Sequence, residues 1–354
     1  MKRGIAMRSL DWLVTAALTV GLISARSLFA DEKTAISPQS VLGEQAEDEM
    51  LARTLGGRQF WGDVNNFHGW RIQQNTFTKH YRLIDARDVR HAWGTFEECL
   101  TALDKAREDH KLDKMKGPAV ILIHGLLQSS RCMTEMGVTI EKSGYTAVKF
   151  DYPSTQVSIP DAARFLDRMV KSLDGIDEIN FVVHSMGGLV VRAYAMEYSD
   201  PRIKRMVMLG TPNRGAELAD ITQQSWFLRT AAGPGARQLG TRSDGLIPKL
   251  PVPKFEFAVI AGSRGTATGW NPLIPGDDDG TVTVASTKLQ GATDFNTVRA
   301  THSRLLWSEE AIAQTVSFLK DGRLRAGGET QPIQIEDVAK ATKTEAACAP
   351  DDAD

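Results

Sequence analysis

A chain of 354 residues is long enough for one large domain or two modest ones. Its hydrophobic content of 42%, charged content of 24% and net charge of −2 are ordinary for a globular protein. Because no basic excess is available to neutralise phosphates, the composition gives no reason to expect a nucleic-acid partner.

The N-terminus has the pattern of an export signal. Basic residues precede the apolar stretch WLVTAALTVGLIS (12–24), and the small residue Ala30 stands before an acidic polar segment. This pattern predicts a signal peptide over 1–30, cleaved near Ala30, and then a polar linker over 31–55. The apolar stretch is shorter than the roughly 20 residues that cross a bilayer, which leaves an uncleaved membrane anchor as the weaker alternative.

The next segment predicts one strand and one helix. Alternation in TFTKHYRLI (76–84) indicates a strand with Phe77, Tyr81 and Leu83 on one face. The stretch that follows reads as a helix, and its Thr95 and Glu98 have the spacing of a capping box.

From residue 118 onward, apolar strands alternate with amphipathic helices. The strands are predicted at 118–124, 145–152, 179–184, 203–210, 255–262 and 296–300. The helices are predicted at 131–142, 159–173, 186–198 and 308–320. Near-continuous apolar strands between helices are typical of a mostly parallel sheet covered by helices on both faces, which is an α/β fold.

The rhythm breaks at 211–253, which is rich in Gly, Pro and polar residues and longer than an ordinary connection. We interpret 56–322 as one domain with a lid insertion at about 211–253, followed by a disordered tail over 323–354. The apolar residues of the insertion fit an acyl pocket under a cover or an ordinary helix core equally well. They are Ile221, Trp226, Phe227, Leu228, Leu246, Ile247 and Leu250.

Three cysteines, Cys99, Cys132 and Cys348, have no metal-binding spacing. In an oxidising compartment Cys99 and Cys132 can pair only if the fold brings them together, which the sequence leaves open.

The stretch VVHSMGGLVV (182–191) places Ser185 between an apolar strand and a pair of glycines. A serine on a sharp strand-to-helix turn has its hydroxyl clear of the sheet and near the N-terminal amides of the next helix. Gly187 and Gly188 supply small neighbours, whereas Val183 stands where G-x-S-x-G has its first glycine. Taken alone, this pattern fits a purely structural turn and a turn that holds a nucleophile equally well.

A base and an acid would activate such a serine. Beyond Ser185 only one histidine remains, His302 in RATHSRLLW. The acidic run PGDDDGTV supplies the orienting acid, for which Asp279 is the first choice and Asp278 the reserve. A calcium-like loop is the alternative, but the run lacks the spaced ligands of an EF-hand.

Two backbone N–H groups are candidates for an oxyanion hole. In ILIHGLLQSS a strand ends in His-Gly, so the amide of Leu126 can face the reacting centre, and the amide of Met186 directly follows the serine. His124 is expected to hold this loop by hydrogen bonds rather than act as a base.

Together the stretches HGLL, VVHSMGGLV, LGTPNRG, DDDGTV and ATHSRLL, in this order over about 118–320, resemble the α/β-hydrolase superfamily and its bacterial lipase and esterase branch. The resemblance implies the α/β-hydrolase fold, with Ser185 as nucleophile, His302 as base and Asp279 as acid. It also implies Leu126 and Met186 as oxyanion donors.

The resulting hypothesis is an exported serine hydrolase that cleaves carboxylic esters, with a small-molecule or lipid ester as substrate and no metal or organic cofactor. An acyltransferase or thioesterase with the same triad is the second hypothesis. A non-catalytic hydrolase-like binding protein is the third, and the ordered Ser, Asp and His argue against it. Membrane association is possible but is indicated only by the N-terminal signal.

Overall fold

The computed structural model describes residues 52–53, 58–223 and 233–334. The predicted signal peptide and most of the predicted linker lie outside the described residues, as do Cys348 and the end of the predicted tail. Among the described residues no helix combines the length and the apolar character needed to span a membrane.

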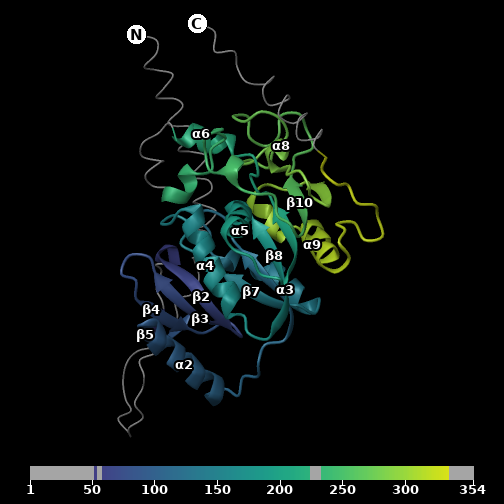
Figure 1. Ribbon diagram of the computed structural model, residues 1–354. Coiled ribbons are helices and arrows are strands. Elements are labelled where there is room, and N and C mark those ends of the chain that lie inside the picture. The colour runs from purple at the N-terminus through teal and green to yellow at the C-terminus, as the bar shows by residue number, and fades with distance from the viewer. Residues whose placement is uncertain (1–51, 54–57, 224–232, 335–354) are drawn as a thin grey trace, which may run out of the picture. The chain divides into compact units, whose positions relative to one another are not determined.

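Two β-sheets form the framework of the described chain (Figure 1). The larger is a six-stranded sheet in the order β11-β10-β9-β8-β6-β7, and all of its pairings are parallel. The smaller is a five-stranded antiparallel sheet in the order β1-β5-β4-β3-β2. The strands are β1 Ala52–Arg53, β2 Trp61–Phe67, β3 Trp70–Asn75, β4 Tyr81–Ile84, β5 Val89–Gly94, β6 Gly117–Ile123, β7 Thr146–Phe150, β8 Ile176–His184, β9 Ile203–Leu209, β10 Glu256–Gly262 and β11 Asp294–Val298.

Helices connect and cover these strands. The α-helices are α2 Phe96–Asp109, α3 Thr134–Lys142, α4 Ile159–Ser172, α5 Met186–Glu197, α6 Glu217–Gln223, α8 Val284–Thr287 and α9 Glu309–Asp321. The 3-10 helices are η1 Arg58–Phe60, η2 Ser130–Met133, η3 Ile247–Lys249 and η4 Ser303–Trp307.

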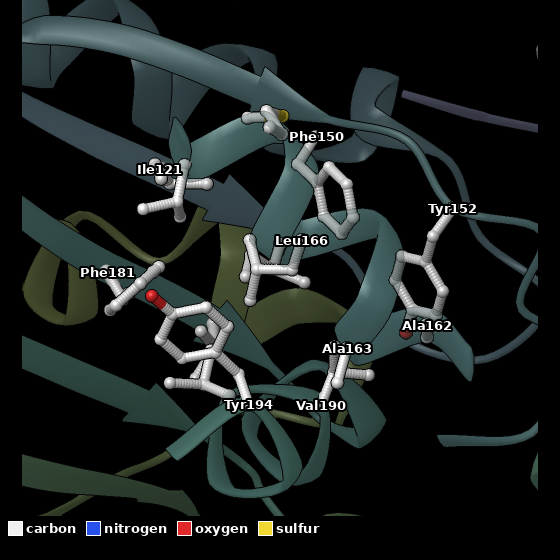
Figure 2. Packing of buried hydrophobic residues seen from close by; sticks show 14 of the residues in the cluster. Ile121, Phe150, Tyr152, Ala162, Ala163, Leu166, Phe181, Val190 and Tyr194 are labelled. Carbon is white, nitrogen blue, oxygen red and sulfur yellow. The ribbon is translucent and has the colours of Figure 1, made fainter. Parts of the chain in front are cut away.

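The parallel sheet is buried on both faces, as its apolar strands predict. Successive residues of a strand point to opposite faces, so Ile121 of β6 packs in one core cluster and its neighbour Val120 in another. The first cluster contains Leu166 of α4 and side chains of α5, and Figure 2 shows these residues gathered against Phe150 and other strand residues. The second contains side chains of α3 and α9. The predicted α/β fold, with helices on both faces of a parallel sheet, is confirmed.

The antiparallel sheet differs from the single long strand predicted at 76–84. Only Tyr81–Ile84 is strand, and Phe77 lies in the preceding turn with 64% of its surface exposed. The reason is local. The Asn75 side chain accepts hydrogen bonds from the N–H groups of Phe77 and Thr78, which ends β3 in a turn, and Lys79 has a positive φ of 62°. The prediction that Phe77 lies on one strand face with Tyr81 and Leu83 is therefore wrong.

The antiparallel sheet packs against α2 and α4. The predicted capping box of α2 is confirmed, because the Thr95 side chain accepts from the Glu98 N–H and the Glu98 carboxylate accepts from the Thr95 N–H. Gly62 allows β2 to approach α4 closely, since a Cβ there would lie 2.6 Å from the Phe165 ring.

Ordered structure continues past residue 322, where the sequence predicted that the domain ends. The buried Asp294 carboxylate accepts from the Arg325 side chain and from the backbone N–H groups of Leu324 and Gln331. Ile333 is also buried, so residues 323–334 pack beside β11. Cys99 and Cys132 are free thiols, which answers the question of a disulfide between them.

Candidate active site

Ser185 lies at the turn between β8 and α5 in a strained backbone conformation. Its φ of 53° and ψ of −126° are rare for a residue with a side chain. The two glycines that follow make room for the turn. A Cβ on Gly187 would lie 2.8 Å from the His124 carbonyl oxygen at the end of β6, and one on Gly188 would collide with Thr211. The residue at the motif's first glycine, Val183, is buried in the core and does not obstruct the turn.

The half-buried His302 and the buried Asp279 form a pair at the carboxyl edge of the parallel sheet. His302 Nδ1 lies 2.6 Å from Asp279 Oδ2, and the His302 backbone N–H donates to the Asp279 carbonyl at 2.8 Å. The other carboxylate oxygen accepts from the N–H groups of Thr281 and Val282. Gly210, at the end of β9, leaves space for the pair, because a Cβ there would lie 3.2 Å from both Asp279 Oδ2 and His302 Nδ1.

The other aspartates near this edge have different partners. Asp277 accepts from the Ser263 hydroxyl at 2.5 Å. Asp278, the reserve acid, accepts from three backbone N–H groups of its own loop, and burial raises its pKa. Asp294 binds the segment after α9. In the described part of the chain no group of three or more His, Cys, Asp or Glu side chains is arranged to hold a metal ion.

His184 links the serine turn to the His302 loop. Its Nε2 lies 3.0 Å from the His302 carbonyl oxygen, and its Nδ1 lies 2.9 Å from Oε1 of Gln128. Burial, and then the neighbouring His302, hold the pKa of His184 well below its ordinary value. A neutral imidazole has one N–H, so His184 donates to one of these two oxygens at a time. The residue directly before Ser185 therefore contacts the backbone of His302.

The loop after β6 lies directly on the serine. A Cβ on Gly125 would lie 2.9 Å from the Ser185 Cβ, and the Gly125 N–H donates to Gln128 Oε1. Leu126 follows, and Met186 is the first residue of α5, where N–H groups have no acceptor within the helix. Among the described residues neither amide donates to a protein acceptor. Both predicted oxyanion donors therefore lie on segments that meet at Ser185.

His124 holds this loop from below. Its Nδ1 lies 2.8 Å from the Gly125 carbonyl oxygen, its ring stacks on Tyr152 with centroids 4.5 Å apart, and its own carbonyl accepts the Tyr152 hydroxyl. Asp151, beside Tyr152, accepts from the backbone N–H and the hydroxyl of Ser130. The expectation that His124 supports the loop agrees with these contacts.

A buried charged cluster connects the same region to the antiparallel sheet. Arg71 of β3 donates to Asp151 at 2.7 Å and lies 3.6 Å from Asp63 of β2. Asp63 accepts from the Asp151 N–H and the Gln73 side chain. Burial raises the pKa of Asp63 to about 6, although Arg71 opposes the shift. Burial also acts on Asp151, but Arg71 and then His124 outweigh it and lower the pKa of Asp151.

Gln59 and Gln128 are supporting residues that the sequence analysis missed. The Gln59 side chain donates to the Gln128 carbonyl at 3.0 Å and accepts from the hydroxyls of Ser154 and Thr155. Neither glutamine stands in a recognisable motif, and the contacts join segments about 70 to 100 positions apart in the chain. No local signal could have indicated them.

The insertion at 211–253 also reaches the site. A Cβ on Gly233 would collide with the Thr155 carbonyl, and one on Gly235 would lie 3.2 Å from the Met186 sulfur. Leu246, Ile247 and Leu250 pack in the core, whereas Trp226, Phe227 and Leu228 lie outside the described residues. The three core residues thus favour the helix-core interpretation for their part of the insertion.

A family model described as the alpha/beta hydrolase fold matches residues 118–247. This match agrees with the parallel sheet and covering helices of the structure, so the chain has the α/β-hydrolase fold. The matched segment carries the loop after β6, the Ser185 turn and most of the insertion. The residues of the antiparallel sheet precede it. No curated protein matches the chain.

Several solved structures are similar to this chain. The Bacillus licheniformis lipase BlEst2 is 20% identical, with a TM-score of 0.45, and the match covers 58% of this chain and 92% of that one. The phospholipase PlaB from Legionella pneumophila is 16% identical, with a TM-score of 0.48, covering 65% and 62%. The metagenomic carboxyl esterase MGS0156 is 20% identical, with a TM-score of 0.38, covering 53% and 65%.

Proposed function

We propose that this α/β hydrolase is an exported serine hydrolase that cleaves carboxylic esters of small molecules or lipids. The observation that carries the proposal is the 2.6 Å contact between His302 and Asp279, joined through His184 to the strained turn at Ser185. A buried carboxylate that orients an imidazole toward a serine on a strand-to-helix turn is the arrangement that activates a hydroxyl as nucleophile.

In the first half-reaction, Ser185 Oγ attacks the ester carbonyl carbon while His302 takes the hydroxyl proton. The Asp279 carboxylate stabilises the resulting imidazolium and keeps Nδ1 protonated. The N–H groups of Leu126 and Met186 bind the oxyanion, and each such donor lowers the barrier by about 3 kcal/mol. The carbon–oxygen bond of the ester then breaks, and His302 returns the proton to the departing alcohol.

In the second half-reaction, water attacks the acyl-enzyme. His302 takes a proton from the water, the oxyanion forms at the same two amides, and the bond from the acyl carbon to Ser185 Oγ breaks. The proton goes back to Ser185, and the carboxylic acid leaves. The chemistry requires no group beyond these side chains and amides.

A fluorophosphonate probe tests the nucleophile without assuming a substrate. We expect covalent labelling of the native chain and none of Ser185→Ala, together with a loss of nitrophenyl-ester hydrolysis on the order of 10⁶-fold in kcat. Ser317→Ala, the same substitution on α9, is the control and should label like the native chain. A native chain that is folded but unreactive would support the binding-protein reading instead.

Export is a separate part of the proposal. It rests on the basic and apolar pattern at the N-terminus, which lies outside the described residues. Expression in an exporting bacterium, followed by intact-mass measurement, should show a mature chain that begins close to Asp31. A membrane-bound chain that retains Met1 would favour the uncleaved anchor.

A further inference from the structure

We propose that one end of the antiparallel sheet is a docking surface for an anionic lipid bilayer. The surface consists of Phe60, Trp61, Phe77, His80 and Trp93, and we call it the aromatic surface. Large exposed apolar side chains are concentrated here: Phe77 and Trp93 are each 64% exposed and Phe60 is 41% exposed. Trp61 and His80 are half-buried beside them.

The five side chains form one continuous surface. The rings of Phe60 and Phe77 are 5.6 Å apart, those of Trp61 and His80 are 5.1 Å apart, and those of His80 and Trp93 are 4.6 Å apart. Strand register explains the cluster, because the start of β2, the end of β3, the start of β4 and the end of β5 meet at the same end of the sheet (Figure 1).

The charged side chains at this end of the sheet are basic. The segments 58–62, 76–82 and 90–94 contain four basic residues and no acidic residue, in a chain whose net charge is −2. One of the four, Arg82, is buried within the sheet. Lys79 is exposed in the turn beside Phe77, and the half-buried Arg90 lies 6.0 Å from the Trp93 ring. Exposed cations beside exposed aromatic rings complement anionic headgroups and the apolar layer beneath them.

A bilayer fits this surface better than a glycan does. Phe60 and Phe77 have no polar atoms for sugar hydroxyls, whereas phenylalanine and tryptophan favour the bilayer interface. Glycan recognition would also need convergent polar groups, and Glu98, which follows shortly after Gly94, is engaged in the capping box of α2.

The aromatic surface adjoins the candidate active site. Gln59, next to Phe60, binds the Gln128 carbonyl in the loop after β6. In that loop Leu127 is 56% exposed and has a positive φ of 59°. A bilayer that contacts Phe60 therefore lies beside the loop that carries Leu126. Docking itself does not depend on the proposed function, but its benefit for a lipid ester substrate does.

Vesicle binding tests the proposal directly. The full chain carrying Ser185→Ala, which cannot hydrolyse the lipid, is sedimented with vesicles of phosphatidylglycerol and phosphatidylcholine at low salt. We expect the partition coefficient to fall about thirtyfold in Lys79→Glu/Arg90→Glu and roughly tenfold in Phe77→Ala/Trp93→Ala. Lys142→Glu/Lys320→Glu and Met196→Ala, at exposed positions of α3, α9 and α5, are the matched controls and should bind unchanged.

Hydrogen exchange on the same protein without further substitutions keeps the test independent of folding defects. Amides of residues 76–80 should exchange more slowly with anionic vesicles present, while amides around Met196 stay unchanged. Equal binding by the surface variants and the controls, or no protection of 76–80, would overturn the proposal. Binding to a soluble polysaccharide in place of vesicles would do so as well. Because Ser185 is already replaced, failure of docking and failure of the proposed catalysis are read separately.

Discussion

The two sheets of this protein use their residues in opposite ways. The parallel sheet buries continuous apolar strands on both faces. Its candidate catalytic residues lie in the turns at its carboxyl edge. The antiparallel sheet buries polar side chains within its strands, among them Asp63, Arg71, Gln73 and Arg82. One sheet carries the candidate catalytic residues, and the other carries a buried charged cluster that ends at the loop beneath them.

This difference indicates that the antiparallel sheet has more than a structural role. A buried cluster of charges adds little stability unless it is fully paired, so apolar residues would serve a merely structural role equally well. Here the cluster joins Asp151 and the loop after β6, and Gln59 joins the same loop from outside the sheet. We therefore expect the antiparallel sheet to influence activity as well as stability.

The largest expected effect belongs to the parallel sheet. Asp279→Asn removes the charge that orients His302 and should lower kcat on the order of 10⁴-fold while leaving the fold intact. Asp278→Asn is the matched control on the neighbouring position, and its kcat should change by no more than about threefold, since Asp278 bonds only its own loop. If the two variants exchanged these results, Asp278 would be the acid.

The second effect tests the buried cluster through pH. The pKa of Asp63 is about 6 in the folded chain, above its ordinary value of 3.8, because of burial. The folded state thus binds the proton more tightly than the unfolded state. This contribution to stability is complete below pH 3.8 and is lost as the pH rises through 6. The loss amounts to as much as about 3 kcal/mol.

Asp63→Asn should therefore flatten the dependence of the free energy of unfolding on pH between 4 and 7, measured by urea denaturation. The lowered pKa of Asp151 acts in the opposite sense and below this window, so it does not mask the change. Asp104→Asn, at an exposed position of α2, is the control and should retain the native slope. A native slope in Asp63→Asn would show that this carboxyl titrates normally.

The smallest effect asks whether the antiparallel region reaches the chemistry. Gln59→Ala removes the donor to the Gln128 carbonyl and the acceptor for Ser154 and Thr155, so the loop carrying Leu126 loses its outer support. We expect kcat to fall roughly tenfold with little change in KM, because a misplaced oxyanion donor affects the transition state most. Gln74→Ala, the same change within β3, should leave kcat unchanged. If kcat fell equally in both variants, the result would indicate that Gln59 only stabilises the fold.

The sequence by itself determined the parallel half of the fold and the candidate triad. Continuous apolar strands between amphipathic helices allow few arrangements other than a covered parallel sheet. A serine between an apolar strand and two glycines is a local signal, and so are a single downstream histidine and an acidic run. The elements at 118–124 and 203–210 and the capping box at Thr95 could be located from patterns a few residues long.

Tertiary structure decided the rest. The strands β2 and β3 carry polar residues that are buried because Arg71 and Asp63 meet Asp151, far away in the chain. The acidic run offered three carboxylates, with Asp279 as the first choice, and the loop geometry places Asp279 alone among them against His302. Contacts between distant segments have no period and no motif. A linear pattern therefore reports which face a residue prefers, and only the folded chain determines which partner it finds there.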